Sequence, residues 1–383
     1  MTILYFTNTL GAYSETFIHR IIELFRKDKG INIHVVTSKK SSSVAKDVVY
    51  SGWNKFSLHE RVQLKISEKL NRRRQAIEKV MAKKIKEIKV PFDVAWVDFG
   101  VNAILIYSHL NKLGKRVICH VHGYDASKSL QNRLYSSELV RFSQENYIIT
   151  PSNHLKRRLE LVGCYSRNIF VIPYSISPEI KPKVWHTNPQ NSLHRLLFVG
   201  RFVDKKCPQA LIHMLRLVVN ELPKTHLVMC GDGLLMPIVQ KLILEKQLEK
   251  NVTLMGAVSQ DQVYEEMKKA DIYIQHSVTA NSGDQEGFPN SLAEAAAHAL
   301  PIISTTHSGI TEIVQHEATG YLVQEHDYVS MAQYTIQLLK NPALIVKMGK
   351  NSRQRILQLS NEKIRLIRIK EVIELAVKNK MAT

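Results

Sequence analysis

The sequence predicts an α/β protein with two doubly wound, Rossmann-like domains that face each other across a central cleft. Three observations lead to this expectation. The length of 383 residues suits two domains of ordinary size. Short apolar runs alternate with amphipathic helical stretches, as in parallel sheets covered by helices. A polar stretch with several prolines interrupts this alternation near the middle of the chain.

The first domain is expected to span residues 1–175. Continuous apolar runs are typical of strands that are buried on both faces. Such runs predict strands at Ile3–Thr7, Ile33–Thr37, Val94–Val97, Val117–His122, Tyr147–Thr150 and Ile169–Pro173. Thr16–Arg26 reads as a helix between the first two strands. Residues 176–192, which contain Pro178, Pro182 and Pro189, are expected to be an interdomain linker.

The second domain is expected to span residues 193–360. Its predicted strands are Leu196–Val199, Thr225–Cys230, Val252–Met255, Ile272–Gln275 and Pro301–Ser304. Pro208–Asn220 reads as a helix between the first two of these strands. In doubly wound sheets, ligands bind beyond the carboxyl ends of the strands, so the loops there are the candidates for chemistry.

Composition excludes several classes of protein. Apolar residues make up 44% and charged residues 23%, which does not fit a collagen, a disordered tail or a disulfide scaffold. No stretch approaches about 20 uncharged apolar residues, the length that spans a bilayer. Four separated cysteines, Cys119, Cys164, Cys207 and Cys230, lack metal-site spacing, and we expect them to be buried thiols in a reducing cytosol.

The positive charge is concentrated in the N-terminal half. Of a net charge of +19, residues 1–190 supply 31 Lys and Arg against 15 Asp and Glu. This asymmetry predicts an anionic partner on that half: nucleic acid, an anionic membrane or a phosphorylated substrate. Within it, the basic helical segment Arg61–Lys89 either lies against anionic lipid headgroups or is a solvated helix face; the sequence leaves both interpretations open.

The most informative segment is G-D-Q-E-G-F-P-N-S-L-A-E, residues 283–294, which leads from a polar loop into an Ala-rich helix. Free N–H groups at the start of that helix, around Asn290–Leu292, would form an anion site. Gly287 lets the backbone approach a ligand closely. Glu286 and Glu294 could accept hydrogen bonds from hydroxyls on two parts of one extended ligand.

This segment resembles the signature of retaining glycosyltransferases of family 4, which have the GT-B fold. Other landmarks occur in the order that the family has them: L-G-A-Y-S-E-T-F-I near the start, H-G-Y-D (122–125), P-S (151–152), V-I-P-Y (171–174), G-R-F-V-D-K-K (200–206), G-D-G (231–233) and S-G-I-T-E-I-V (308–314). The form of the first loop is common among bacterial transferases that assemble exopolysaccharides, capsules and lipid-linked glycans. In this fold, a C-terminal helix at about 361–377 would pack back on the N-terminal domain.

The resemblance implies roles for single residues on the donor side. Arg201 and Lys206 match the pair that binds the diphosphate of the nucleotide sugar, and such cations would neutralise the charge that develops on the leaving group. Glu294 matches the glutamate that binds the ribose, and Glu286 the residue that contacts hydroxyls of the donor sugar. His122 is expected to contact the donor sugar near the reacting carbon, and His120 to face the opposite side of the strand.

Further residues are implied at the edges of the site. The remaining expected donor contacts are Gly11, Gly231, Gly233, Val258, Gly287, Phe288, Asn290, Ser291 and Leu292. Glu15, Thr16 and Asp125 are candidates on the acceptor side; Asp125 is expected to orient its loop, and the other two could equally be capping residues. The family often has two glycines in the first loop, where this chain has Gly11 followed by Ala12 and Tyr13.

The sequence therefore predicts a metal-independent, retaining hexosyltransferase. It would move a hexose or N-acetylhexosamine from a nucleotide sugar, UDP-linked rather than GDP-linked, to a glycan or lipid-linked acceptor in cell-surface polysaccharide biosynthesis. No Asp-x-Asp metal motif stands at a strand end, and no cofactor is expected. We expect a cytoplasmic protein able to attach to the inner face of the cell membrane. Two alternatives are another GT-B enzyme, such as a nucleotide-sugar epimerase, and a basic nucleic-acid-binding protein, which the lack of interleaved aromatic and basic residues disfavours.

Overall fold

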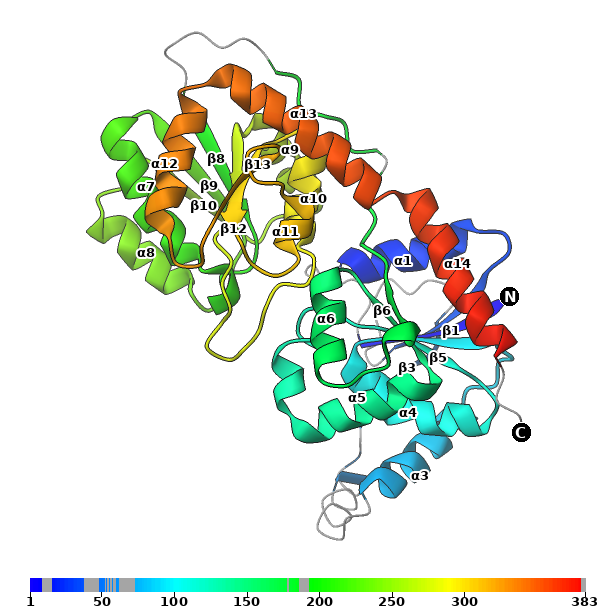
Figure 1. The fold of residues 1–383 in the computed structure, drawn as a ribbon. Helices are drawn as coiled ribbons and strands as arrows, with labels where there is room; N and C mark the ends of the chain where they lie inside the picture. Colours follow the sequence, from blue (N-terminus) through cyan, green and yellow to red (C-terminus); the bar gives the residue numbers. More distant parts are fainter. Residues whose placement is uncertain are drawn as a thin grey trace. The chain divides into compact units, whose positions relative to one another are not determined.

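The computed structural model describes residues 1–8, 16–37, 48–51, 53, 55, 57, 60–61, 73–177, 179–185 and 193–379. The chain divides into two compact units, each with its own sheet (Figure 1). The first unit comprises residues 1–172 and 363–383, and the second comprises residues 173–362. The predicted fold class, two Rossmann-like parallel sheets covered by helices, is confirmed.

The first unit is built on a seven-stranded parallel sheet with the order β3-β2-β1-β4-β5-β6-β7. The strands are β1 (Thr2–Thr7), β2 (Asn32–Thr37), β3 (Val48–Ser51), β4 (Val94–Asp98), β5 (Val117–His120), β6 (Tyr147–Thr150) and β7 (Ile169–Val171). The sequence did not predict β3, and β5 ends two residues before the predicted end at His122. The strand order reverses between β1 and β4, so the loops after these two strands flank the switch point of this sheet.

Helices cover both faces of this sheet (Figure 1). One face packs against α1 (Thr16–Lys27) and α14 (Glu362–Lys378), with Ile21, Phe25, Ile369 and Ile373 buried against the strands. The other face packs against α3 (Arg73–Lys86), α4 (Gly100–Lys112), α5 (Arg133–Glu145) and α6 (Asn153–Leu161). The described part of the unit also contains two short 3-10 helices, η1 (Lys128–Gln131) and η2 (Ser166–Asn168). The C-terminal helix thus belongs to the core of the first unit.

The second unit has a six-stranded parallel sheet with the order β10-β9-β8-β11-β12-β13. Its strands are β8 (His194–Val199), β9 (Thr225–Cys230), β10 (Val252–Gly256), β11 (Ile272–Ile274), β12 (Ile302–Thr305) and β13 (Gly320–Val323). Its helices are η3 (Asp204–Lys206), α7 (Pro208–Glu221), α8 (Met236–Glu245), α9 (Gln260–Lys269), α10 (Asn290–Ala297), α11 (Ile310–Ile313), α12 (Tyr328–Leu339) and α13 (Pro342–Leu359). The sequence did not single out β13, which is short and begins at a glycine.

The expected linker differs in the structure. The division between the units falls at residues 172 and 173, and the described part of the segment 176–192 is bonded to the second unit. The Ile176 N–H donates to the Ser360 carbonyl (3.1 Å), and the Lys183 N–H donates to the His298 carbonyl (2.8 Å). These backbone bonds explain why the segment follows the second unit despite its prolines.

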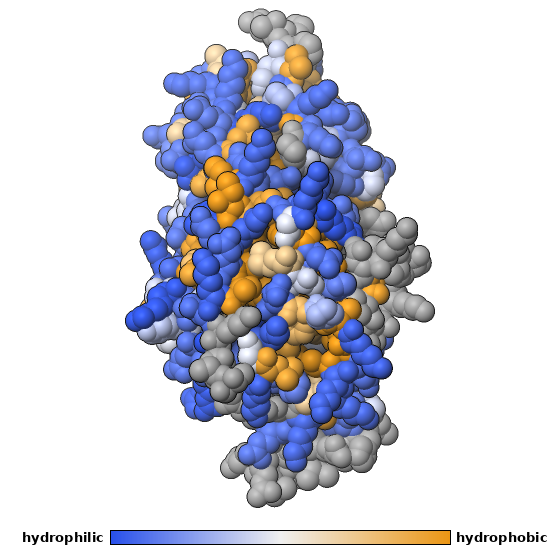
Figure 2. All heavy atoms as spheres, turned by 90° about the vertical axis from the view of Figure 1, so that its right-hand side faces the viewer, coloured by the Kyte–Doolittle hydropathy of each residue, from blue (hydrophilic) through white to orange (hydrophobic). Residues whose placement is uncertain are grey.

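The polarity of the surface and the state of the cysteines fit what the composition predicts. Hydrophilic side chains cover much of the face drawn in Figure 2, with hydrophobic patches between them. None of the described helices is long and apolar enough to pass through a bilayer. All four cysteines are buried and free, as predicted.

Candidate functional site

The second unit offers a site where its strand order reverses. The chain leaves the central strand β8 through Gly200–Lys206, and it leaves the neighbouring strand β11 through the loop that precedes α10. The carboxyl ends of both strands lie at the same edge of the sheet, so side chains about 70 to 80 residues apart in the sequence meet there.

Lys206 is a largely covered cation at this edge, with its side chain 12% exposed. Its Nζ lies 3.2 Å from Glu286 Oε1 and 3.2 Å from Gln275 Oε1. Burial lowers the pKa of Lys206, and Glu286 acts in the opposite direction. Arg201, the second predicted cation, is exposed, and its charge also lowers the pKa of Lys206. The two predicted diphosphate-binding cations therefore lie close enough to interact, Lys206 largely covered and Arg201 open to solvent.

Glu286 is a buried carboxylate held from two directions. Burial opposes its ionisation, but the charges of Lys206 and Lys205 outweigh this effect and lower the pKa of Glu286 to about 2. Its backbone N–H donates to His307 Nε2 (3.2 Å). Since that nitrogen accepts, His307 Nδ1 carries the proton and donates it to Glu325 Oε1 at 2.6 Å. The Glu286 carbonyl also accepts a bond from the Ser308 hydroxyl, in the predicted S-G-I-T-E-I-V segment.

Gln275 is a residue of this site that sequence reasoning missed. Its Oε1 accepts bonds from Lys206 Nζ, from the Tyr273 hydroxyl (3.2 Å) and from the Ser291 hydroxyl (3.4 Å). Its Nε2 donates to the Ser277 hydroxyl (2.7 Å). A fully buried amide with all these partners links the loop after β8 to the start of α10. The only sequence signal was its place as the last residue of a predicted strand.

The start of α10 lies at the same edge, as the sequence predicted for Asn290, Ser291 and Leu292. Asn290 Oδ1 is buried and has no hydrogen-bond partner among the described residues, which leaves a polar atom available to a ligand. Glu294, on the first turns of the helix, is 4% exposed and accepts a bond from Gln260 Nε2 (3.2 Å). In the loop before the helix, Gly287 and Phe288 are buried, and the Phe288 ring lies 6.0 Å from that of Tyr174.

The glycines after β9 serve the chain's own packing. A Cβ atom on Gly231, whose φ is +142°, would lie 1.9 Å from the Gly200 carbonyl oxygen. A Cβ atom on Gly233 would lie 2.5 Å from the Phe202 carbonyl oxygen. The prediction that these glycines let the backbone approach a nucleotide stays untested. What the structure shows is that they let the backbone after β9 pass close to the backbone after β8. Val258, expected beside the base, follows the adjacent strand β10 at the same edge.

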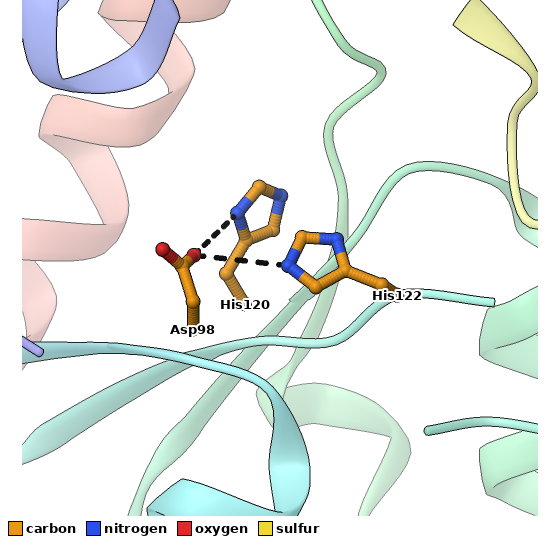
Figure 3. A group of neighbouring side chains, drawn as sticks. All are labelled: Asp98, His120 and His122. Atoms are coloured by element: carbon orange, nitrogen blue, oxygen red, sulfur yellow. Dashed lines mark hydrogen bonds and ion pairs between the residues drawn. The ribbon is translucent and has the colours of Figure 1, made fainter. Parts of the chain in front are cut away.

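The first unit carries a second cluster at the carboxyl ends of β1, β4 and β5. Asp98 Oδ1 lies 3.3 Å from His120 Nδ1 and 3.7 Å from His122 Nε2 (Figure 3). Its Oδ2 accepts a bond from the Tyr5 hydroxyl. Burial opposes ionisation of Asp98, but the hydrogen bonds and charges of the two histidines hold its pKa at about 2. Burial, reinforced by His122, lowers the pKa of His120 to about 3, so His120 is neutral at pH 7.

This cluster corrects one expectation. His120 does not face away from His122: the two rings lie 4.5 Å apart and both point toward Asp98 (Figure 3). Residues two apart on an extended chain share a face, so period-two alternation places these histidines together. His120 is therefore part of the surroundings of His122.

Asp125 holds the loop that carries His122. Its Oδ1 accepts the Gly100 N–H and its Oδ2 accepts the His122 N–H, each at 3.0 Å. Burial raises the pKa of Asp125 to about 6, although these backbone hydrogen bonds favour the ionised form. Its side chain is fully buried among these contacts, which agrees with orientation of the loop and leaves no open face toward an acceptor.

Some predicted residues lie outside what the structure describes. Gly11 and Glu15 fall in residues 9–15, which are not described. Thr16 opens α1, but its side chain is likewise not described.

Asp98, His120 and His122 are the group of described residues that could hold a metal ion, with their ligand atoms within 4.8 Å of one another. Two imidazoles and a carboxylate are ligands that suit zinc.

Two Rossmann-like, parallel-sheet domains of this kind are the architecture of GT-B glycosyltransferases. The family model "Glycosyltransferase Family 4" matches residues 14–180, and "Glycosyl transferases group 1" matches residues 183–355. The chain belongs to glycosyltransferase family 4, so it is an enzyme of the glycosyltransferase class.

Known proteins resemble the chain over most of its length. The amylovoran biosynthesis glycosyltransferase AmsK of Erwinia amylovora is 28% identical over 294 residues, 75% of this chain and 71% of AmsK. The putative colanic acid biosynthesis glycosyltransferase WcaL of Escherichia coli is 28% identical over 254 residues, 64% of this chain and 62% of WcaL. Anabaena Alr3699/HepE, solved in complex with UDP-glucose, has the same fold with a TM-score of 0.76, 15% identity, and coverage of 98% of this chain and 100% of that one.

Proposed function

We propose that this enzyme is a retaining glycosyltransferase that moves a hexose or N-acetylhexosamine from a nucleotide sugar to a glycan or lipid-linked acceptor in cell-surface polysaccharide biosynthesis. One observation carries the proposal: Lys206, Glu286 and the start of α10 meet at the switch point of the second sheet. This arrangement supplies a cation, helix N–H groups and a carboxylate around one position, as the binding of a sugar diphosphate requires.

The proposed reaction needs no carboxylate nucleophile. The bond between the anomeric carbon and the diphosphate oxygen breaks, and a bond forms between the same carbon and the acceptor oxygen on the same face of the sugar. The acceptor proton passes to an oxygen of the departing diphosphate. Lys206, Arg201 and the N–H groups at the start of α10 would stabilise the charge on that diphosphate without a metal ion. Glu286 would accept bonds from sugar hydroxyls, and Glu294 from the ribose.

The substrates are proposed from the relatives. AmsK and WcaL are named for the biosynthesis of exopolysaccharides, which supports a glycan acceptor in polysaccharide assembly. The complex of HepE with UDP-glucose supports a UDP-sugar rather than a GDP-sugar. The positive charge of residues 1–190 favours a lipid diphosphate-linked glycan, an anionic polymer or the membrane that carries them, and with it attachment to the cytoplasmic face of the membrane.

Thermal-shift screening against UDP-, GDP- and ADP-sugars tests the donor. A ligand that binds the native state raises the melting temperature, and we expect the largest shift with a UDP-sugar. Product analysis then separates transfer from epimerisation, because an epimerase turns the donor over without an acceptor. Lack of any shift across the panel, or turnover without an acceptor, would contradict the proposal.

A further inference from the structure

The side-chain amide of Gln275 has one orientation that its neighbours allow. Its Nε2 donates to the Ser277 hydroxyl (2.7 Å), and its Oε1 accepts a bond from Lys206 Nζ (3.2 Å). The reversed amide would turn its N–H groups toward an ammonium, which can only donate, so the contact with Lys206 requires the oxygen on that side. Gln275 is fully buried, and a hydrogen bond in such surroundings is stronger than one in water.

The backbone of Gln275 is also held in place. Its N–H donates to the Ile303 carbonyl (3.1 Å), and its carbonyl accepts the Ser304 hydroxyl (2.7 Å). The Ser277 carbonyl accepts a bond from the Thr305 hydroxyl (2.5 Å). All three of these partners lie on β12, the neighbouring strand of the sheet. The amide oxygen of Gln275 is therefore fixed to the sheet from its backbone and from its side chain.

The ammonium of Lys206 lies between a neutral acceptor and a charged one. Gln275 Oε1 and Glu286 Oε1 are each 3.2 Å from Nζ. An ammonium has three hydrogens, and these two oxygens can engage two of them. No other acceptor among the described residues contacts this ammonium within hydrogen-bond distance, so its third hydrogen is available to a ligand.

The neutrality of the amide matters for an anion site. Glu286 already balances the charge of Lys206, and Arg201 adds a further positive charge close by. A neutral acceptor can fix the ammonium without adding a second negative charge to this edge. The stem of a lysine is flexible, and a cation that is held in place before the ligand arrives stabilises developing charge without reorganisation.

We propose that Gln275 is a positioning residue that fixes the ammonium of Lys206 toward the diphosphate of the nucleotide sugar and leaves the local positive charge intact. This inference rests on the proposed function, in which Lys206 binds that diphosphate. The same amide oxygen accepts the hydroxyl of Ser291 (3.4 Å), the second residue of α10. Gln275 thus holds the cation and the helix start, the two groups proposed to bind the diphosphate, at one point of the second unit.

The first test measures the pKa of Lys206 in the full chain without any ligand. Burial already lowers this pKa in the wild type. Gln275→Met should lower it further because the ammonium loses an acceptor, whereas Gln275→Glu should raise it because a carboxylate favours the charged form. Spectra of protein labelled with ¹³C-lysine report the titration, and Lys206→Met identifies the signal. The control Ser304→Ala removes a buried hydrogen bond to the carbonyl of Gln275 but keeps the amide, so it should leave this pKa unchanged.

The second test measures the affinity for UDP by calorimetry. Both Gln275 variants should bind UDP about tenfold more weakly or worse, as expected when a hydrogen bond to a charged group is lost or an added charge repels the ligand. Ser304→Ala should bind UDP like the wild type. Gln275→Met combined with Lys206→Met should bind UDP no more weakly than Lys206→Met alone, because Gln275 acts through that cation.

A purely structural role for Gln275 predicts different results. UDP affinity would then fall in step with the melting temperature, and Ser304→Ala would lose as much affinity as the Gln275 variants. That result, an unchanged pKa of Lys206 in both Gln275 variants, or additive losses in the double variant would overturn the proposal. If Gln275→Met fails to fold, Gln275→Glu keeps the shape of the side chain and should still combine a raised pKa of Lys206 with weaker UDP binding. A wild type that binds no nucleotide would contradict the proposed function, and the ligand-free titrations would still test the positioning.

Discussion

Replacing Glu286 by glutamine removes a buried negative charge from the switch point of the second sheet and keeps the shape of the side chain. In the wild type, Glu286 Oε1 lies 3.2 Å from Lys206 Nζ. Without the carboxylate, the buried ammonium retains the Gln275 amide oxygen at 3.2 Å but loses its counter-ion. Breaking a buried pair by removing one partner is strongly destabilising.

The magnitude follows from the pKa of Glu286. Its value falls from 4.5 to about 2, which corresponds to about 3 kcal/mol of stability at neutral pH. The pKa of Lys206 is lowered, so burial destabilises its charged form by more than the attraction to Glu286 stabilises it. The pair therefore contributes less to the free energy of unfolding than the pKa of Glu286 alone suggests. We therefore expect Glu286→Gln to destabilise the second unit by about 2 to 3 kcal/mol.

The pH dependence has a definite sign. A carboxyl with a depressed pKa contributes its full stability above its unfolded value of 4.5, and this contribution is lost as the pH falls toward about 2. Glu286→Gln lacks this titration. The difference in unfolding free energy between wild type and variant should be constant from about pH 5 to 8 and should shrink below 4.5.

Hydrogen–deuterium exchange of peptides from β11 and β12 measures the opening free energy of the second unit directly. The exposed carboxylate of Glu249 provides a control, and Glu249→Gln should change exchange by less than about 0.5 kcal/mol. A Glu286→Gln effect as small as that of the control, or one that grows as the pH falls, would refute the electrostatic reasoning.

Four further predictions follow from the site and the charge distribution. Glu294→Ala should abolish the donor-induced thermal shift while the protein stays folded, and a retained shift would remove Glu294 from the ribose site. Gly231→Ala should destabilise the second unit by more than about 3 kcal/mol, because the new Cβ would meet the Gly200 carbonyl oxygen at 1.9 Å. The control Gly256→Ala, whose Cβ would meet nothing within 4 Å, should cost about 1 kcal/mol. Similar melting temperatures for the two variants would contradict the clash. Turnover should survive EDTA, and loss that added metal restores would contradict the proposed metal-independent mechanism. In liposome sedimentation at low salt, the protein should prefer anionic lipid, whereas equal binding to neutral vesicles would argue against the electrostatic attachment.

Much of the architecture could be read from local patterns. Strands buried on both faces produce continuous apolar runs, and the predicted strands of both sheets are present in the structure. The G-F-P-N-S-L-A-E segment indicated a loop entering a helix, and α10 begins at Asn290 as predicted. These features succeed because strand burial, the first turn of a helix and glycine geometry are governed by neighbours in the chain.

The partners of the site residues depended on the order of the strands. Tyr5 and Asp98 are 93 residues apart and meet because β1 and β4 are adjacent in the sheet, and Lys206 meets Gln275 because β8 neighbours β11. The early end of β5, at His120, likewise follows from pairing with β4 and β6. By itself, the sequence determined two Rossmann-like domains and the loops that carry chemistry. Only the tertiary structure decided which buried side chains contact each carboxylate. Sheet order and register bring distant strand ends together, and local sequence does not encode that pairing.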